Sequence, residues 1–173
     1  MIKQDTSENL VKTVYLGIGS NLGNRKKNIE IAKFKLQKHK IKILKCSGNY
    51  ESQSWPNPNN PKFINIIIKI QTHLSPLKLL KICNLIETQL GRKRSIKNSP
   101  RTCDIDIIDY DQKISNNKYN DLIFPHKAMS QRNFVLLPLF EINQSWKHPK
   151  TKINIVKLIS SLHIDDLRSI KQI

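Results

Sequence analysis

Four short stretches of the chain carry hydrophobic residues in the alternating or continuous runs that are typical of β-strands. They are TVYLGIGS (13–20), IKILKCSGNYES (41–52), FINIIIKIQTHL (63–74) and CDIDIIDYD (103–111). The third is rich in isoleucine, whose branched side chain favours extended backbone. We therefore expect four strands, joined by helices and by polar loops such as the proline-rich QSWPNPNNPK.

Two other stretches repeat their hydrophobic residues at helical spacing. Residues 21–40 place lysines opposite the apolar side, and Asn24 is a suitable N-cap. Residues 75–91 begin with the N-cap Ser75 and end at Gly91, which supplies a left-handed stop. The expected buried stripes are Ile29, Ala32 and Leu36 in the first helix, and Leu79, Cys83, Ile86 and Leu90 in the second.

The elements follow one another as strand, helix, strand, strand, helix, strand. This order is that of the split βαβ, or ferredoxin-like, α+β fold, a mostly antiparallel sheet with helices packed on one face. We expect a single domain over residues 1–173, with a loose N-terminal extension (1–12) and a C-terminal tail (150–173) that has a weak helical signal. Residues 112–121 read as a polar turn or hairpin, and residues 124–142 as a loop followed by a short helix.

Charge and cysteine content narrow the function classes only a little. The 173 residues include 30 Lys and Arg against 13 Asp and Glu, and the net charge of +17 favours polyanionic partners. Because the basic residues are scattered, most of them are expected on solvated faces. The three separated cysteines form no zinc motif and indicate reduced thiols. With no apolar leader and no run of membrane-spanning length, we expect a cytoplasmic protein without a membrane partner.

The fourth strand carries an unexpected pair of negative charges. Asp104 and Asp106 are two residues apart, so they point to one face, with Cα atoms about 6.5–7 Å apart. Such a pair can reach two metal ions at the roughly 3.5–4 Å spacing of phosphoryl-transfer sites. It can equally keep an exposed strand face soluble, and this motif alone favours neither interpretation. Asp109 and Asp111, near the strand end, are expected at the surface or in a turn.

Basic residues precede these carboxylates. Arg92, Lys93, Arg94 and Lys97 fall in one loop just ahead of Arg101. In phosphoryl transfer, metal ions hold the polyphosphate while arginines neutralise charge that moves onto the leaving group. Favourable interaction with a helix dipole would account for Arg92 and Lys93, but not for Arg101.

The segment GIGSNLGN (17–24) is rich in glycine, as phosphate-binding loops are, but the spacing of its glycines does not match a known phosphate-binding motif. It contains neither GxxxxGKS/T nor GxGxxG. A single split βαβ also lacks the repeated βαβ units of a dinucleotide fold, which argues against a dinucleotide-dependent oxidoreductase. We expect the glycines to allow tight turns, and Asn21 is left as a residue that can face a ligand.

Five segments, in this order, resemble the 6-hydroxymethyl-7,8-dihydropterin pyrophosphokinases of folate biosynthesis. They are GIGSNLGN, FINIIIKI, IETQLGRKR, SPRTCDIDII and FPHKAMSQRNFVLLPLFEI, and the match runs from about Val14 to about Pro149. The resemblance implies a ferredoxin-like fold and transfer of the β,γ-pyrophosphoryl group of ATP to the hydroxymethyl group of the pterin, with release of AMP.

The resemblance also implies roles for single residues. Asp104 and Asp106 match the ligands of two Mg²⁺ ions, and Arg92 and Arg101 match catalytic-loop arginines that bind the triphosphate. The remaining matches place the pterin ring between Phe63 and Phe134, with Asn65 and the backbone around Ser52, Gln53 and Trp55 at its polar edges, and ATP near Asn84, Glu87, Arg94, His126 and Arg132.

The residues themselves support part of this assignment. Phe63 and Asn65 share one strand face and can offer a flat heterocycle an aromatic platform and an amide. Taken alone, Phe63 is more often a core aromatic residue. Asn84 and Glu87 are neighbours on one helix face, as residues of a solvated face would also be. Taken alone, His126 is a loop histidine without a role.

The chain departs from the family pattern at several positions. Asn98 and Ser99 stand where members often carry an aromatic residue and then Gly, and Lys127 stands where an aromatic residue often follows the His. Phe63 replaces a frequent Tyr, which keeps ring stacking and drops the hydroxyl. The changes at Asn98, Ser99 and Lys127 bear on ATP affinity and loop closure, and not on the reaction.

A basic ferredoxin-like domain could instead bind RNA. That function calls for exposed aromatic residues in an RNP-type pattern on the central strands. Aromatic residues make up only 6% of the chain, and no such motif is present. We therefore expect ATP and the pterin as partners, no nucleic acid, and a monomer.

Overall fold

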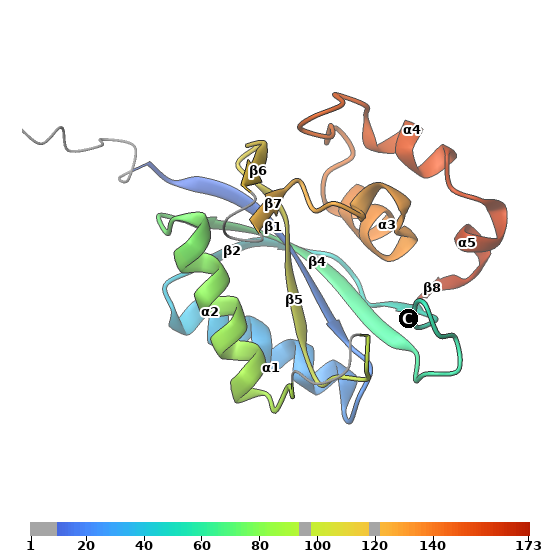
Figure 1. Cartoon of the computed structure of the whole chain (residues 1–173), viewed down its shortest axis with the longest axis horizontal. Coiled ribbons are helices and arrows are strands. Elements are labelled where there is room, and N and C mark those ends of the chain that lie inside the picture. Colours follow the sequence, from blue (N-terminus) through green and yellow to red (C-terminus); the bar gives the residue numbers. More distant parts are fainter. Residues whose placement is uncertain (1–9, 94–97, 118–121) are drawn as a thin grey trace, which may run out of the picture.

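The structure is a computed structural model of the chain, and it describes residues 10–93, 98–117 and 122–173. The elements are β1 (Lys12–Ser20), α1 (Arg25–Lys38), β2 (Lys42–Cys46), β3 (Tyr50–Ser52), β4 (Phe63–Thr72), α2 (Pro76–Gln89), β5 (Asp104–Tyr110), β6 (Ser115–Asn117), β7 (Leu122–Phe124), the 3₁₀ turn η2 (Met129–Gln131), α3 (Asn133–Ile142), α4 (Ile155–Ser160), α5 (Ile164–Arg168) and β8 (Ile170–Gln172). Most of the strands form one twisted sheet, shown in Figure 1.

Strand β4 holds this six-stranded sheet together. The sheet order is β5–β1–β4–β3–β8, and β2 also pairs with β4. One edge of β4 pairs with β1, while its other edge pairs with β3 near Phe63 and with β2 near Ile70. All of these pairs are antiparallel, as is the pair between β1 and β5. The order of the main strands, β5–β1–β4–β2, confirms the predicted ferredoxin-like α+β fold.

Helices cover both faces of the sheet, so the prediction of helices on one face was wrong. Helices α1 and α2 bury one face, which includes Leu16 and Ile18 of β1 (Figure 1). Helices α3 and α4 bury part of the other face, where Ile67 of β4 and Ile108 of β5 lie. The continuous isoleucine run 66–68 is the sequence counterpart of this arrangement, because a strand covered on both faces has no polar side.

The ends of the first two helices confirm the capping predictions. The side chain of Asn24 accepts a hydrogen bond from Lys27 N at 3.1 Å, and that of Ser75 accepts one from Lys78 N at 3.4 Å. Gly91 follows α2 with φ +82°, a left-handed conformation that glycine adopts at little cost.

The predicted strand over residues 41–52 is two strands in the structure. β2 and β3 are separated at Ser47, whose backbone N–H donates to Ile67 O at 2.9 Å, and at Gly48, whose N–H donates to the Glu141 carboxylate at 3.0 Å. Alternating polarity gives no sign of this break, because it depends on a partner far along the chain. The helical signal of the tail is confirmed by α4 and α5, and β8 then adds a strand that was not predicted.

The hairpin predicted after the fourth strand is present as β6 and β7, whose connecting residues 118–121 lie outside the described part of the chain. All three cysteines are free, as expected for reduced thiols. Over the described ranges, no helix is long and apolar enough to cross a bilayer.

Asp109 corrects a further prediction, since it is buried at 1% exposure and is not a surface residue. Its carboxylate accepts hydrogen bonds from Trp146 Nε1 at 2.8 Å and from Gln112 N at 3.0 Å. These bonds tie the end of β5 to the segment between α3 and α4. Asp111 does lie in the turn after β5, where it accepts a hydrogen bond from Thr13 N at 3.2 Å.

We predict that Asp109→Ala lowers the free energy of unfolding by about 1–3 kcal/mol, because the buried indole N–H of Trp146 then has no acceptor. Urea denaturation followed by circular dichroism would measure this loss. Glu30→Ala is the control, since Glu30 pairs with Lys33 on an exposed face and its removal should cost less than about 1 kcal/mol. Equal losses in the two variants would contradict the role assigned to Asp109.

Candidate active site

A pocket opens on the sheet face that also carries α3. Two rows of paired residues form its floor: Asp104, Gly19 and Asn65 in one, and Asp106, Gly17 and Ile67 in the next. The glycines are therefore strand residues and not the tight turns that were predicted. A Cβ on Gly19 would lie 2.8 Å from Asn65 Oδ1, so only glycine leaves the floor open between the aspartates and Asn65. A turn glycine does follow the strand, since Gly23 has φ +68°.

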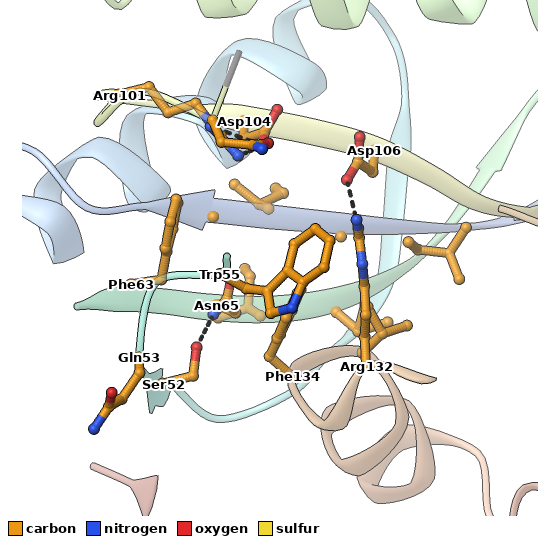
Figure 2. Close-up of a pocket in the computed structure, with 18 residues that line it drawn as sticks. Ser52, Gln53, Trp55, Phe63, Asn65, Arg101, Asp104, Asp106, Arg132 and Phe134 are labelled. Atoms are coloured by element: carbon orange, nitrogen blue, oxygen red, sulfur yellow. Dashed lines mark hydrogen bonds and ion pairs between the residues drawn. The ribbon is translucent and has the colours of Figure 1, made fainter. Parts of the chain in front are cut away.

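Ten of the predicted site residues line this pocket, although they come from four separate parts of the chain. Figure 2 shows how they converge from β3, β4, β5, the loops beside them and the start of α3. The ten are Ser52, Gln53, Trp55, Phe63, Asn65, Arg101, Asp104, Asp106, Arg132 and Phe134.

Arginines lie beside both carboxylates. Arg101 donates from Nε to Asp104 Oδ2 at 2.8 Å, and its Nη2 lies 2.7 Å from the same oxygen. Arg92 Nη1 donates to the other oxygen of Asp104. Arg132 Nη1 lies 3.9 Å from Asp106 Oδ2, a looser ion pair. Asp104 is thus the more tightly paired of the two carboxylates.

The same arginines lie over the aromatic rings of the pocket. The guanidinium of Arg101 is 5.1 Å from the ring centre of Phe63, and that of Arg132 is 5.5 Å from the ring centre of Phe134. Both distances are in the range of cation–π contacts. Beside Phe63, the amide of Asn65 donates to Ser52 Oγ at 3.0 Å, a bond drawn in Figure 2.

Glu87 and Asn84 are on α2, behind the pocket lining. Glu87 is 2% exposed, accepts a hydrogen bond from Ile105 N at 2.7 Å, and pairs with Arg92. It therefore positions Arg92 beside Asp104. Asn84 is half-buried one turn earlier on the same helix. Arg94 lies outside the described residues.

His126 is held beside β5 by its backbone, whose N–H donates to Ile108 O at 2.9 Å. Its Nδ1 accepts a hydrogen bond from Ala128 N at 3.3 Å. Burial, and then the nearby positive charge of Arg132, lowers the pKa of His126 to about 4. Near neutral pH its imidazole is therefore uncharged, and it can donate a hydrogen bond but cannot offer a positive charge.

Asn21 braces the loops around the pocket and does not face it. It is 2% exposed, and its Oδ1 accepts a hydrogen bond from Arg101 N at 2.7 Å. Its Nδ2 donates to Ser54 Oγ at 3.2 Å and to Pro61 O at 3.1 Å. The possibility that Asn21 faces a ligand was therefore wrong, because all of its polar atoms hold two loops together.

Sequence reasoning did not assign several other pocket residues. Asn98, noted only as a departure from a family pattern, lines the pocket with φ +64°. Ile67, Ile108 and Val135 form apolar walls that look like ordinary core positions in the sequence. An asparagine in a polar loop is a weak sequence signal for left-handed backbone, because asparagine adopts that conformation more often than most residues. The isoleucines give no signal of a pocket.

The two carboxylates suit a hard divalent cation. Partial burial, and then repulsion by Asp104, raises the pKa of Asp106 to about 7, so this carboxylate lacks a full share of positive charge that a cation would supply. In the described part of the chain, no third His, Cys, Asp or Glu joins this pair to form a larger metal cluster. Mg²⁺ commonly binds through one or two carboxylates together with water and substrate phosphates, so this donor set fits it.

Comparison with known proteins identifies the family. The model of the 7,8-dihydro-6-hydroxymethylpterin-pyrophosphokinase (HPPK) family matches residues 15–144. This chain belongs to the HPPK family. This is the family that the motif resemblance predicted.

Curated relatives agree with this assignment. The chain is 39% identical over 137 residues to a 2-amino-4-hydroxy-6-hydroxymethyldihydropteridine pyrophosphokinase from Aquifex aeolicus, covering 79% of this chain and 84% of the relative. It is 40% identical over 166 residues to the folic acid synthesis protein fol1 of Pneumocystis carinii, covering 95% of this chain and 22% of the relative. The chain thus spans about a fifth of the length of that longer protein.

A solved structure supports the fold. A Plasmodium falciparum HPPK-DHPS crystal structure with pterin and p-hydroxybenzoate superposes with a TM-score of 0.72 at 15% sequence identity. The superposition covers 95% of this chain and 47% of the other. At this level of identity the similarity concerns the fold alone.

We predict that Asp106→Asn stabilises the metal-free protein, and that the gain is larger at pH 8 than at pH 5. Because the folded-state pKa of Asp106 is raised from 3.8 to about 7, the folded protein holds an extra proton between these values. The group therefore reduces stability as pH rises through that window, and asparagine removes this effect. Urea denaturation in EDTA at both pH values would measure it.

Glu30→Gln, on the exposed face of α1 and paired with Lys33, is the control for this pH series and should show no such difference between pH 5 and pH 8. A gain for Asp106→Asn that does not change with pH would contradict the raised pKa.

Proposed function

We propose that this chain binds Mg-ATP and 6-hydroxymethyl-7,8-dihydropterin in the pocket described above and carries out the family's pyrophosphoryl transfer there. The hydroxymethyl oxygen of the pterin forms a bond to the β-phosphorus of ATP. The bond from that phosphorus to the oxygen bridging the α- and β-phosphates breaks, so AMP leaves and the hydroxyl proton is released. The products are the pterin diphosphate, a folate precursor, and AMP.

The observation that carries this proposal is the convergence of three kinds of group in one pocket. Paired carboxylates, three arginines and two aromatic rings with an amide lie on or beside one sheet face. Metal-bound polyphosphate needs the first two kinds, and a flat heterocycle with polar edges needs the third.

In this proposal Asp104 and Asp106 hold two Mg²⁺ ions. When bound, Mg²⁺ neutralises charge on the phosphate oxygens and orients the polyphosphate. The two carboxylates would fix its position on the rigid strand β5. Since Arg92 and Arg101 occupy the oxygens of Asp104 in this structure, those ion pairs must open before Asp104 can become a ligand.

Arginines released from Asp104 would then bind the triphosphate. A triphosphate offers them charged oxygens with which guanidinium groups form strong paired hydrogen bonds. Arg92 and Arg101 would stabilise the negative charge that moves onto AMP as it departs. We assign Arg132 and the region of Asn84, Glu87, Arg94 and His126 to ATP binding, with His126 as an uncharged hydrogen-bond donor.

The pterin ring is assigned to the space between Phe63 and Phe134. Asn65 would pair with one polar edge, and the backbone of Ser52, Gln53 and Trp55 with another. Arg101 lies over Phe63 in this structure, so its transfer to the triphosphate also uncovers the ring face for the pterin. The expectations of a monomer, a cytoplasmic location, a single domain and no nucleic-acid partner remain predictions from sequence.

We predict that Asp104→Ala and Asp106→Ala each remove most turnover, because each takes away a carboxylate proposed to hold Mg²⁺. The assay measures AMP formed from Mg-ATP with and without 6-hydroxymethyl-7,8-dihydropterin. Glu30→Ala, on the opposite face of the sheet, should retain wild-type activity. Wild-type rates from either aspartate variant would refute the metal-binding role.

We predict that Arg101→Ala lowers kcat by about 10²–10³-fold, the cost typical of losing one electrostatic donor to a transition state. Binding of Mg-ATP, measured by calorimetry, should weaken far less, because other arginines still contact the triphosphate. Arg168→Ala, on exposed helix α5, is the matched control and should leave both quantities unchanged. An unchanged kcat in Arg101→Ala would count against the assignment.

A further inference from the structure

The C-terminal segment 163–173 lies against the pterin side of the pocket. Its strand β8 pairs with the outer edge of β3, with Ser52 opposite Ile170 and Tyr50 opposite Gln172. Figure 1 shows β8 at the end of the sheet, after α5 and below α3. The backbone N–H of Ile173 also donates to Asn49 O at 2.9 Å. This segment follows the stretch that the family model matches, which ends at residue 144.

Strand β3 depends on this pairing for a fixed position. It has only three residues, and its other edge pairs with Phe63–Asn65 of β4. Without β8 it would be a very short edge strand, which is an easily displaced element. Ser52, whose hydroxyl accepts the amide hydrogen bond of Asn65, is at its end and leads into the pocket loop. Movement of β8 would therefore move a wall of the proposed pterin subsite.

Asn133 ties the same segment to the other wall. Its side chain is 8% exposed, and Nδ2 donates to Asp166 O at 2.5 Å and to Ser169 Oγ at 3.1 Å. Ser169 immediately precedes β8, and Asn133 immediately precedes Phe134. One buried amide thus links the aromatic ring at the start of α3 to the strand that borders Ser52.

A second cavity lies between the first pocket and the hydrogen bonds that Asn133 makes to the C-terminal segment. It has a volume of about 490 Å³ and shares Ser52, Trp55 and Phe134 with the first pocket. Asn133, Asp166 and Ser169 also line it. The hydrogen bonds of Asn133 therefore lie at this cavity, beside the proposed pterin subsite, and they limit how far the start of α3 and the C-terminal segment can separate.

We propose that Asn133 is a positioning residue of the pterin subsite. By holding the C-terminal segment against the start of α3, it fixes the distance between Phe134 on one side and Ser52 and its loop on the other. This inference rests on the proposed function, which places the pterin ring beside Phe134 and Phe63. Asn133 itself makes no contact with the reacting groups.

Steady-state kinetics of Asn133→Ala test this proposal. We expect the KM for 6-hydroxymethyl-7,8-dihydropterin to rise about three- to ten-fold, the effect of losing one or two buried hydrogen bonds. The KM for Mg-ATP and kcat should stay within about two-fold of wild type. The two aspartates, Arg92 and Arg101 lie on other elements, and the side chain of Arg132 extends to Asp106 (Figure 2). If Asn133 only stabilised the fold, its loss would not raise the KM for the pterin while leaving the KM for Mg-ATP unchanged.

Asn133→Asp separates the hydrogen bonds to the C-terminal segment from the local bond that Asn133 accepts from Phe134 N. Asp retains the oxygen that accepts the N–H of Phe134 and suits the first turn of a helix, but it lacks the Nδ2 donor. It should therefore raise the pterin KM at least as much as Ala does. A wild-type pterin KM in Asn133→Asp, or equal rises in the KM for pterin and for Mg-ATP, would overturn the proposal.

Two controls complete the test. Asn154→Ala removes the N-cap of α4 in the same C-terminal region and should leave the pterin KM unchanged, so a rise there equal to that of Asn133→Ala would overturn the proposal. Phe63→Ala should raise the pterin KM through lost stacking. If Phe63→Ala raises it and Asn133→Ala does not, only the role of Asn133 fails. If Phe63→Ala has no effect, the proposed pterin subsite fails and the role of Asn133 fails with it.

Discussion

The repulsion between Asp104 and Asp106 is the constraint on which the site depends. Two carboxylates on one strand face, partly removed from water, cannot both be ionised at low cost unless positive charge is supplied. In this structure the charge comes from arginines before β5 and before α3, which contact the two aspartates from different sides. In the proposed reaction, metal ions bound with the polyphosphate of ATP would supply this positive charge instead.

The same charges connect the proposed nucleotide side of the pocket to the proposed pterin side. Arg101 contacts Asp104 and also covers the ring of Phe63, while Arg132 is near Asp106 and covers the ring of Phe134. Each arginine thus occupies a carboxylate and an aromatic face together. A ligand that draws these guanidinium groups away from the aspartates also changes the surface offered to the heterocycle, so the two halves of the site are physically coupled.

The sheet makes this arrangement possible because its second face is only partly covered. Helices α1 and α2 pack on one face, whereas α3 and α4 cover part of the other and leave the floor around Gly17 and Gly19 open. The C-terminal segment then borders the remaining side through β8 and Asn133. The pocket is thus bounded by elements from both halves of the chain.

The sequence by itself determined the elements whose signals are local: strand and helix periodicity, the caps at Asn24 and Ser75, and the shared face of Asp104 and Asp106. Its motifs also identified the family and ten residues of one pocket. Only the tertiary structure decided which groups meet across long separations. The burial of Asp109, the bracing role of Asn21, the split between β2 and β3, and the pairing of β8 each depend on a partner distant in the chain. Such a partner leaves no mark on local periodicity, since the same residue types occur in exposed turns.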